Sequence, residues 1–244
     1  MKTLILSTAA VALSAGMAFA AGHGSTVRMG TEGAYPPYNF INDAGEVDGF
    51  ERALGDELCK RAELNCTWVT NDWDSIIPNL VSGNYDAIMA GMSITPEREE
   101  VIAFSEAYTQ PDPSAFVAMS ADADLSAGVI AAQSGTIQAG YVASDMPEAT
   151  LLEFATPEES VAAVRNGEAD AVLADKAFLA PVAEAGELAF VGDDVLIGGG
   201  IGIGLRQTDT ELKAKFDAAI QSMKDDGTLN TMITDMLPGS ATFE

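Results

Sequence analysis

Short apolar segments alternate with amphipathic ones along this chain, and this alternation constrains the fold more than any other feature. The strand candidates are residues 27–30, 67–69, 86–90, 115–119, 128–132, 170–174 and 201–205. The helix candidates are residues 50–64, 156–166 and 208–226, and the last two begin with the capping-box sequences Thr156–Glu159 and Thr208–Glu211. Strands that alternate with helices are typical of α/β folds with mostly parallel sheets. We therefore expect an α/β fold of this kind.

The N-terminal segment has the three parts of a secretory signal peptide. Lys2 precedes an uncharged run, Thr3 to Ala20, which closes on the small-x-small triplet Ala18-Phe19-Ala20. We expect cleavage after Ala20 and export to the periplasm. No later stretch reaches the roughly 18 apolar residues that a membrane span requires, so we expect a chain that does not span the membrane. Retention of residues 1–20 as an anchor is the alternative.

Charge and residue usage exclude several classes of function. The chain has 12 Lys and Arg against 37 Asp and Glu, a formal net charge of −25. So negative a surface repels nucleic acid and anionic lipid. The single histidine, His23, lies close to the expected mature N-terminus, which leaves no basis for a catalytic triad or a His-ligated metal. We expect no cofactor, no metal and no enzymatic activity.

The two cysteines, Cys59 and Cys66, lie at the end of an expected helix and the start of an expected strand. In an oxidising compartment, a lone pair this close predicts a disulfide. Closing so short a loop stabilises the fold by roughly 2.5 kcal/mol in the chain-entropy model. We expect a local structural bond.

A short internal sequence repeat predicts two lobes. Residues 82–90 and 166–174 both read as a helix end, a turn and a strand that opens with Asp-Ala. Segments near residues 108–114 and 192–200, which contain proline or glycine residues that interrupt helices and strands, would connect the lobes. We expect lobe 1 to comprise residues 21–113 and 196–244, and lobe 2, residues 114–195, to be inserted into it. Ligands of open parallel sheets bind beyond the carboxyl ends of the strands, so a crevice shared by the lobes is the expected site.

The glycine cluster of residues 198–204 has spacings like those of a dinucleotide-binding loop. That fingerprint requires a helix directly after the loop, whereas a strand and a polar turn are expected here. We therefore do not expect nucleotide binding.

The segment Ala90 to Glu99 carries the strongest local signal for a ligand site. Thr95 and Pro96 favour a helix start, which places Arg98 in the first turn, where a positive charge opposes the helix dipole. A planar guanidinium binds a carboxylate through two parallel hydrogen bonds. A salt bridge to a neighbouring glutamate is the alternative. A second anion cradle, residues 133–136 before a helix, is expected in lobe 2.

Taken together, these segments resemble the extracytoplasmic solute-binding proteins of polar amino acid ABC transporters, which have the type II periplasmic binding fold. The resemblance is closest to the branch that binds arginine, lysine, ornithine and histidine. It rests on residues 30–38, 48–51, 59–66, 73–78, 90–99, 133–138, 167–175 and 200–206.

The resemblance implies a role for each matched position at the zwitterionic end of an amino acid. Arg98 would bind the α-carboxylate, with the backbone N–H groups of Ser93 and Thr136. Asp175 would bind the α-ammonium, with the Ser93 hydroxyl and the Gly91 carbonyl. A zwitterion requires such a cation and anion on opposed surfaces, because buried charges must be paired.

Selectivity is expected at the side-chain end. There Tyr35 and Trp73 would enclose a long aliphatic stem or a guanidinium plane, Glu32 would meet a terminal cation, and Gln138 is a further candidate contact. Two positions depart from close relatives: Ala90-Gly91 replaces a small polar pair, and Ile137 replaces a hydroxyl residue. These departures affect the identity of the ligand more than its class.

The resemblance thus implies a periplasmic receptor that captures a polar, basic L-amino acid by hinge closure and delivers it to a membrane permease. A monomer is expected. The alternatives are a receptor for glutamine or an opine, a periplasmic cyclohexadienyl-type dehydratase, and a sensory module that signals when it closes.

Overall fold

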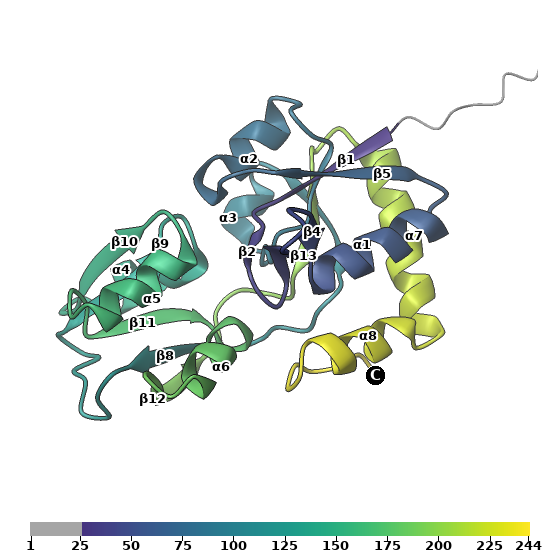
Figure 1. Ribbon diagram of the computed structural model, residues 1–244. Helices are drawn as coiled ribbons and strands as arrows, with labels where there is room; N and C mark the ends of the chain where they lie inside the picture. The colour runs from purple at the N-terminus through teal and green to yellow at the C-terminus, as the bar shows by residue number, and fades with distance from the viewer. Residues whose placement is uncertain (1–25) are drawn as a thin grey trace, which may run out of the picture.

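The computed structural model describes residues 26–244 and has two lobes, each built around a five-stranded sheet (Figure 1). The expected signal peptide, its cleavage site and His23 lie outside the described residues. Within residues 26–244, no helix combines the length and hydrophobicity needed to cross a bilayer. The α/β fold with mostly parallel sheets is confirmed.

The first sheet has the strand order β5-β1-β6-β13-β7. Its strands are β1 (Thr26–Thr31), β5 (Asn65–Thr70), β6 (Ala87–Ile88), β7 (Ala103–Ala107) and β13 (Gly202–Leu205). Strand β1 pairs in parallel with β5 and β6, and β13 pairs antiparallel with β6 and β7. A small antiparallel sheet, β2 (Ala34–Tyr35), β3 (Asn39–Ile41) and β4 (Val47–Asp48), follows β1.

The second sheet has the order β10-β9-β11-β8-β12. Its strands are β8 (Ser114–Ala118), β9 (Val129–Gln133), β10 (Thr150–Phe154), β11 (Ala171–Asp175) and β12 (Ala189–Val195). Two connections, residues 108–113 and 196–201, join this sheet to the first. They pair with each other, because Tyr108 N donates to Ile201 O at 2.8 Å and Ile201 N donates to Thr109 Oγ1 at 3.1 Å.

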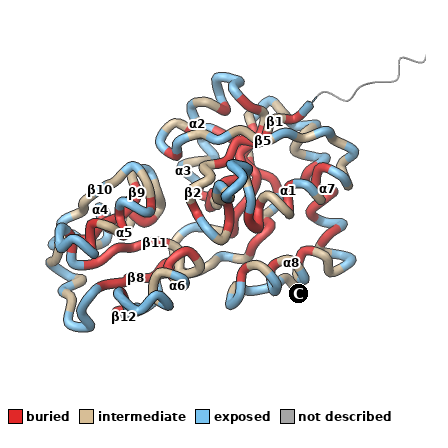
Figure 2. The backbone as a smooth tube through the Cα atoms, viewed as in Figure 1, coloured by how far each residue is buried: buried red, intermediate tan, exposed pale blue. Residues whose placement is uncertain are grey.

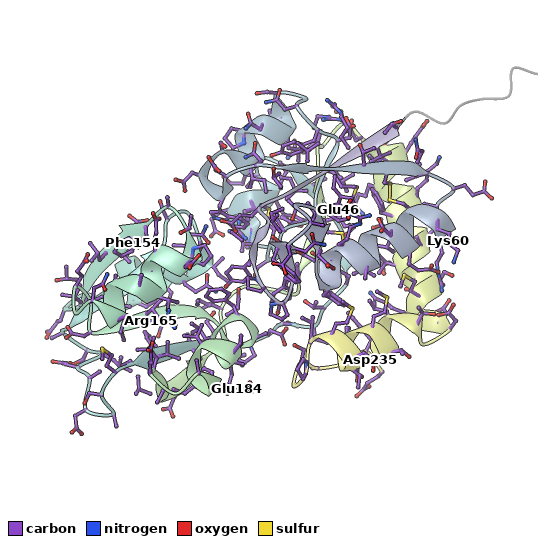
Figure 3. The ribbon with its side chains drawn as sticks, viewed as in Figure 1. Glu46, Lys60, Phe154, Arg165, Glu184 and Asp235 are labelled. Carbon is purple, nitrogen blue, oxygen red and sulfur yellow. A yellow bond between two sulfur atoms is a disulfide. The ribbon has the colours of Figure 1, made fainter. Side chains whose placement is uncertain are left out.

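Helices cover the sheets (Figure 1), and many residues of the strands beneath them are buried (Figure 2). They are α1 (Phe50–Arg61), α2 (Trp73–Val81), α3 (Pro96–Glu99), α4 (Ile137–Asp145), α5 (Pro157–Arg165), α6 (Lys176–Glu184), α7 (Thr210–Asp225) and α8 (Thr228–Met236). In the first lobe, Leu54 of α1 and Phe216 of α7 belong to one apolar cluster, and Ile76 of α2 belongs to another. Side chains of both lobes are drawn in Figure 3, in which Phe154, Arg165 and Glu184 mark the second lobe, and Glu46, Lys60 and Asp235 mark the first.

The expected helix ends are correct in part. The capping box of α5 is confirmed, because Thr156 accepts from Glu159 N and the Glu159 carboxylate accepts from Thr156 N. The second expected box, at Thr208, is wrong. Helix α7 starts at Thr210 after Asp209, with no side-chain cap, and the Thr208 hydroxyl instead donates to Asp209 Oδ1 at 3.3 Å.

The first expected helix is also too long by one turn. Helix α1 ends at Arg61, because Glu63 adopts a left-handed φ of 54° that stops the helix. A non-glycine residue in this region is uncommon and marks a turn.

The internal sequence repeat has a structural basis in two equivalent aspartates. Asp86 Oδ2 accepts from Arg28 N at 3.0 Å, and Asp170 Oδ2 accepts from Val129 N at 2.7 Å. In each lobe the aspartate thus satisfies a backbone donor at the start of the neighbouring strand. The expected strand from residue 86 to 90 is shorter than predicted, since only Ala87 and Ile88 pair.

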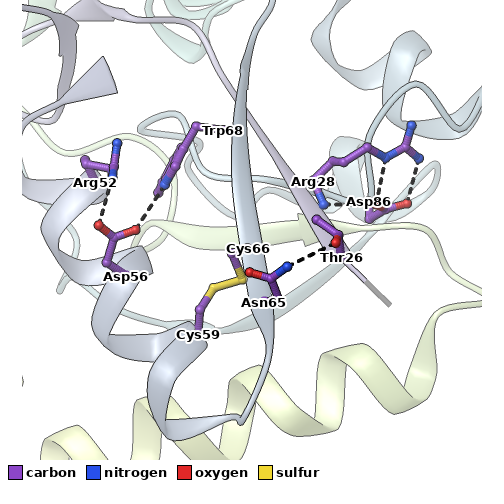
Figure 4. Close-up of a disulfide and its surroundings, with 9 residues drawn as sticks. All are labelled: Thr26, Arg28, Arg52, Asp56, Cys59, Asn65, Cys66, Trp68 and Asp86. Atoms are coloured by element: carbon purple, nitrogen blue, oxygen red, sulfur yellow. Dashed lines mark hydrogen bonds and ion pairs between the residues drawn. A yellow bond between two sulfur atoms is a disulfide. The ribbon is translucent and has the colours of Figure 1, made fainter. Parts of the chain in front are cut away.

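The expected disulfide is confirmed. Cys59 and Cys66 are bonded, with their Cα atoms 6.2 Å apart, and the bond ties the last turn of α1 to β5 (Figure 4). Nearby, Trp68 Nε1 donates to Asp56 Oδ1 at 3.2 Å, which adds a second link between the same two elements.

Candidate functional site

A cavity between the lobes brings all nine expected site residues together. It has about 320 Å³ of empty space, part of it open to solvent. Its lining comprises Glu32, Tyr35, Trp73, Gly91, Ser93, Arg98, Gln133, Thr136, Ile137, Gln138 and Asp175. Glu32, Gln133 and Asp175 follow or end strands β1, β9 and β11, so the cavity lies at the carboxyl ends of parallel strands, as expected.

Arg98 lies in α3, where the Thr95 hydroxyl caps the helix by accepting from Arg98 N at 3.3 Å. Its guanidinium donates to Ser93 O at 2.9 Å and Gly135 O at 3.4 Å, and it lies 5.3 Å from the centroid of the Trp73 ring. Burial lowers the pKa of Arg98 to about 10, against the opposing effect of Asp175.

The alternative interpretation of Arg98, a salt bridge to a neighbouring glutamate, is not what the structure shows. Among the ion pairs of residues 26–244, none within 4.0 Å involves Arg98. Among the described residues, the hydrogen bonds of this guanidinium go only to carbonyl oxygens, so it can accept an anion.

Asp175 provides the opposite charge. It ends β11 and precedes α6 without capping that helix through its side chain. Its carboxylate accepts from Tyr35 Oη at 2.7 Å and from Gln138 Nε2 at 3.1 Å. Burial raises its pKa to about 6, and the nearby charge of Asp112 acts in the same direction. A partly buried carboxylate with this pKa gains from a cation that enters the cavity.

Tyr35 makes contacts that the sequence did not predict. Besides bonding Asp175, its ring stacks on Phe178 of α6 with centroids 4.5 Å apart. Tyr35 belongs to the first lobe and Phe178 to the second, so this pair holds the lobes against each other. The enclosure of a ligand stem between Tyr35 and Trp73 stays a prediction.

Glu32 and Gln133 meet across the cavity at a third position. Gln133 Nε2 donates to Glu32 Oε1 at 2.5 Å and to Ala155 O at 3.0 Å. Burial raises the pKa of Glu32 to about 7, and the charges of Asp72, Asp74 and Glu51 add to this effect. This part of the cavity therefore lies in a negative field, which favours a cation.

Gln133 and Ile137 are the lining residues that the sequence reasoning did not select. Gln133 is the last residue of β9 and begins the expected anion cradle, so its position at a strand end could have identified it. Ile137 not only lacks the hydroxyl of close relatives but also gives the cavity an apolar wall, which shapes a pocket.

The start of α4 lines the cavity with Thr136, Ile137 and Gln138. Thr136 caps this helix: its hydroxyl accepts from Ala139 N at 3.2 Å and donates to Gln133 O at 2.7 Å. Gln138, in the first turn, donates to Ser114 Oγ at 2.9 Å as well as to Asp175. The N-terminus of a helix favours an anion.

Gly91 and Glu51 fix the opposite wall. Gly91 has a φ of 62°, which glycine adopts without strain, and its N–H donates to Glu51 Oε1 at 2.7 Å. Glu51 is fully buried and also accepts from Asn39 and Tyr108, so its hydrogen bonds are met within the lobe.

The chain is similar in sequence and fold to known proteins. A structure of a periplasmic His/Glu/Gln/Arg/opine family-binding protein from Silicibacter pomeroyi in complex with lysine is 70% identical, covers 89% of this chain and 100% of its own, and has a TM-score of 0.86. The lysine/arginine/ornithine-binding periplasmic protein of Escherichia coli K12 is 31% identical over 247 residues, 95% of each chain.

A third similar structure is the ancestral amino acid-binding protein AncCDT-1, described as a precursor of cyclohexadienyl dehydratase. It is 28% identical, covers 87% of this chain and 95% of its own, and has a TM-score of 0.79. The family model for bacterial extracellular solute-binding proteins, family 3, matches residues 27–237. Since this match spans nearly all of the described residues, the chain belongs to the bacterial extracellular solute-binding proteins of family 3.

Proposed function

We propose that this protein is the receptor of an amino acid ABC transporter and captures a polar, basic L-amino acid when its lobes close. The observation that carries the proposal is that Arg98 and Asp175, two opposite and partly buried charges, line one cavity from different lobes. Free α-amino acids carry the complementary pair of charges. The names of the relatives, which include lysine, arginine and ornithine, support the same class of ligand.

The zwitterionic end of the ligand would bind both lobes at once. Arg98 and the N–H groups of Ser93 and Thr136 would hold the carboxylate, whereas Asp175, the Ser93 hydroxyl and the Gly91 carbonyl would hold the ammonium. Arg98, Ser93 and Gly91 come from the first lobe, and Thr136 and Asp175 from the second. A ligand that bridges the lobes stabilises the closed state by its differential contacts.

The far end of the cavity would select the side chain. Glu32 would pair with a terminal ammonium or guanidinium, since its carboxylate is ionised more readily once a cation is near. Tyr35 and Trp73 would flank the aliphatic stem, and Gln138 would orient Asp175. A neutral ligand such as glutamine would forgo the ion pair, and an opine would add a second carboxylate.

The lobes would rotate about the two connections. We assign residues 21–113 and 196–244 to lobe 1 and residues 114–195 to lobe 2. Removal of residues 1–20 would release the mature chain to the periplasm as a monomer that docks on its permease. Transport, rather than signalling alone, is the role we assign to it.

We assign no enzymatic activity to the protein. The dehydratase alternative has one observation in its favour, the similarity to AncCDT-1, but that structure is itself described as an amino acid-binding protein. Incubation with prephenate or arogenate tests the assignment, and formation of the aromatic product, phenylpyruvate or phenylalanine, would contradict it.

A thermal-shift panel tests the proposed ligand class. The protein is unfolded, dialysed and refolded to remove carried-over ligand, and then heated with each common L-amino acid, ornithine, citrulline or octopine. A ligand at about 100 times its Kd adds roughly 2.7 kcal/mol, which raises the Tm by about 5–10 °C for a chain of this size. We expect shifts of this size with lysine, arginine or ornithine. No shift with any amino acid would refute the proposal.

A further inference from the structure

One carboxylate in the hinge receives hydrogen bonds from two distant parts of the chain. Asp112 lies in the connection 108–113, between Pro111 and Pro113. Its Oδ2 accepts from Tyr38 Oη at 3.1 Å and from Ser240 Oγ at 3.0 Å. Tyr38 is fully buried in the first lobe, and Ser240 belongs to residues 238–244, which follow α8. The hinge thus touches a segment that has no contact with the ligand cavity.

The 238–244 segment is fixed to the first lobe on both sides of Ser240. Ser240 N donates to Leu237 O at 3.1 Å. Phe243 pairs twice with Asn230 of α8: Phe243 N donates to Asn230 Oδ1 at 2.9 Å, and Asn230 Nδ2 donates to Phe243 O at 2.8 Å. The Lys224 ammonium lies 4.4 Å from the centroid of the Phe243 ring, which packs on the core of the lobe. Ser240 is therefore a fixed donor.

Asp112 is in turn connected to the second lobe and to the ligand site. The next residue, Pro113, accepts from Lys176 N at 2.9 Å through its carbonyl oxygen, and Lys176 starts α6 directly after Asp175. The charge of Asp112 also raises the pKa of Asp175. The position of Asp112 therefore determines where the second lobe, with its ammonium-binding carboxylate, begins.

We propose that the 238–244 segment braces the hinge: through Ser240 it holds Asp112 in the position seen in this structure. In this position the lobes contact each other through Tyr35 and Asp175, so the brace opposes their separation and slows release of the ligand. Asp112 and Ser240 are positioning residues, since neither lines the cavity. The proposal goes beyond ligand recognition, because it assigns the rate of opening to a contact outside the site. One hydrogen bond of this kind changes an equilibrium by about two- to tenfold.

The test compares Ser240→Ala with Ser240→Thr, which restores the hydroxyl, and with Thr231→Ala. Thr231 is an exposed α8 residue whose hydroxyl bonds only Gly227 O, at 3.1 Å, so its loss is a matched control. Stopped-flow tryptophan fluorescence, with Trp73 as the reporter, gives the rate of lysine dissociation. Small-angle scattering gives the radius of gyration without added ligand.

For Ser240→Ala we expect dissociation to be about two- to tenfold faster and the radius of gyration to increase, whereas Ser240→Thr and Thr231→Ala match the wild type. A merely structural role would lower the Tm and leave the dissociation rate unchanged. Unchanged dissociation and an unchanged radius would overturn the proposal. If the wild type does not bind lysine, the proposed ligand is wrong. The radius of gyration of Ser240→Ala then tests by itself whether the 238–244 segment braces the hinge.

Discussion

Replacement of Glu32 by Gln tests whether the far end of the cavity recognises a cation. The substitution keeps the size of the side chain and removes its charge. Hydrogen bonds to charged groups contribute about 1.5–3 kcal/mol, so the Kd for lysine and arginine should rise about 10- to 150-fold, by the relation of free energy to affinity. The Kd for glutamine should change by less than about threefold, since a neutral amide can still bond to Gln.

The raised pKa of Glu32 adds a second readout. Because its pKa is about 7 in the structure, the carboxyl group is mostly protonated at pH 6. A cationic ligand favours the ionised form, so binding releases up to about one proton from this group at pH 6, and affinity increases as the pH rises to about 7. Titration calorimetry in buffers of different ionisation enthalpy measures this release, which Glu32→Gln should abolish.

A matched control for this variant is Glu46→Gln, an exposed acid of the same lobe (Figure 3). It removes the same formal charge and should leave both affinity and proton release unchanged. Equal losses of affinity for lysine and glutamine in Glu32→Gln would refute the reasoning, and so would the same proton release as in the wild type.

Three further outcomes are expected. Arg98→Ala should weaken binding of every amino acid by at least about 100-fold in calorimetry, since it leaves the ligand carboxylate without its cation. Arg98→Lys should recover part of the lost affinity. Wild-type affinity in Arg98→Ala would contradict the role of Arg98 in binding the carboxylate. The double substitution Cys59→Ser with Cys66→Ser should lower the free energy of unfolding, measured in urea, by about 2.5 kcal/mol. An unchanged unfolding midpoint would refute this contribution of the disulfide. Because burial raises the folded-state pKa values of Glu32 to about 7 and Asp175 to about 6, their contribution to stability is present at low pH and lost as the pH rises through these values. Unfolding of ligand-free Glu32→Gln/Asp175→Asn should depend less on pH between 4 and 8, and an equally steep dependence would exclude this origin.

The sequence predicted those features that depend on local chemistry. Arg98 could be identified because Thr95 and Pro96 define the helix start that positions it, and Asp175 because it ends a buried strand. These local rules also predicted the disulfide. At Thr208 the same rules failed, because the hydroxyl turned toward Asp209, and Asp209 pairs with Arg206 at 2.7 Å.

Features that depend on contacts between the lobes could not be predicted. Gln133 matters because its amide reaches Glu32, which lies 101 residues earlier in the chain. Likewise, the stacking of Tyr35 on Phe178 requires two separately built lobes to meet. No periodicity or capping signal encodes such pairs, since they follow from how the lobes meet.

The measurement that tests the central claim most directly is titration calorimetry of the refolded protein with lysine, cadaverine and Nα-acetyl-lysine. Cadaverine lacks the carboxylate that Arg98 would bind, and Nα-acetyl-lysine lacks the ammonium that Asp175 would bind, but all three ligands keep the terminal ammonium. We predict that lysine binds with a stoichiometry of about one, and that each analogue binds at least about 100-fold more weakly. Comparable affinity for lysine and either analogue would contradict capture of the zwitterion by Arg98 and Asp175.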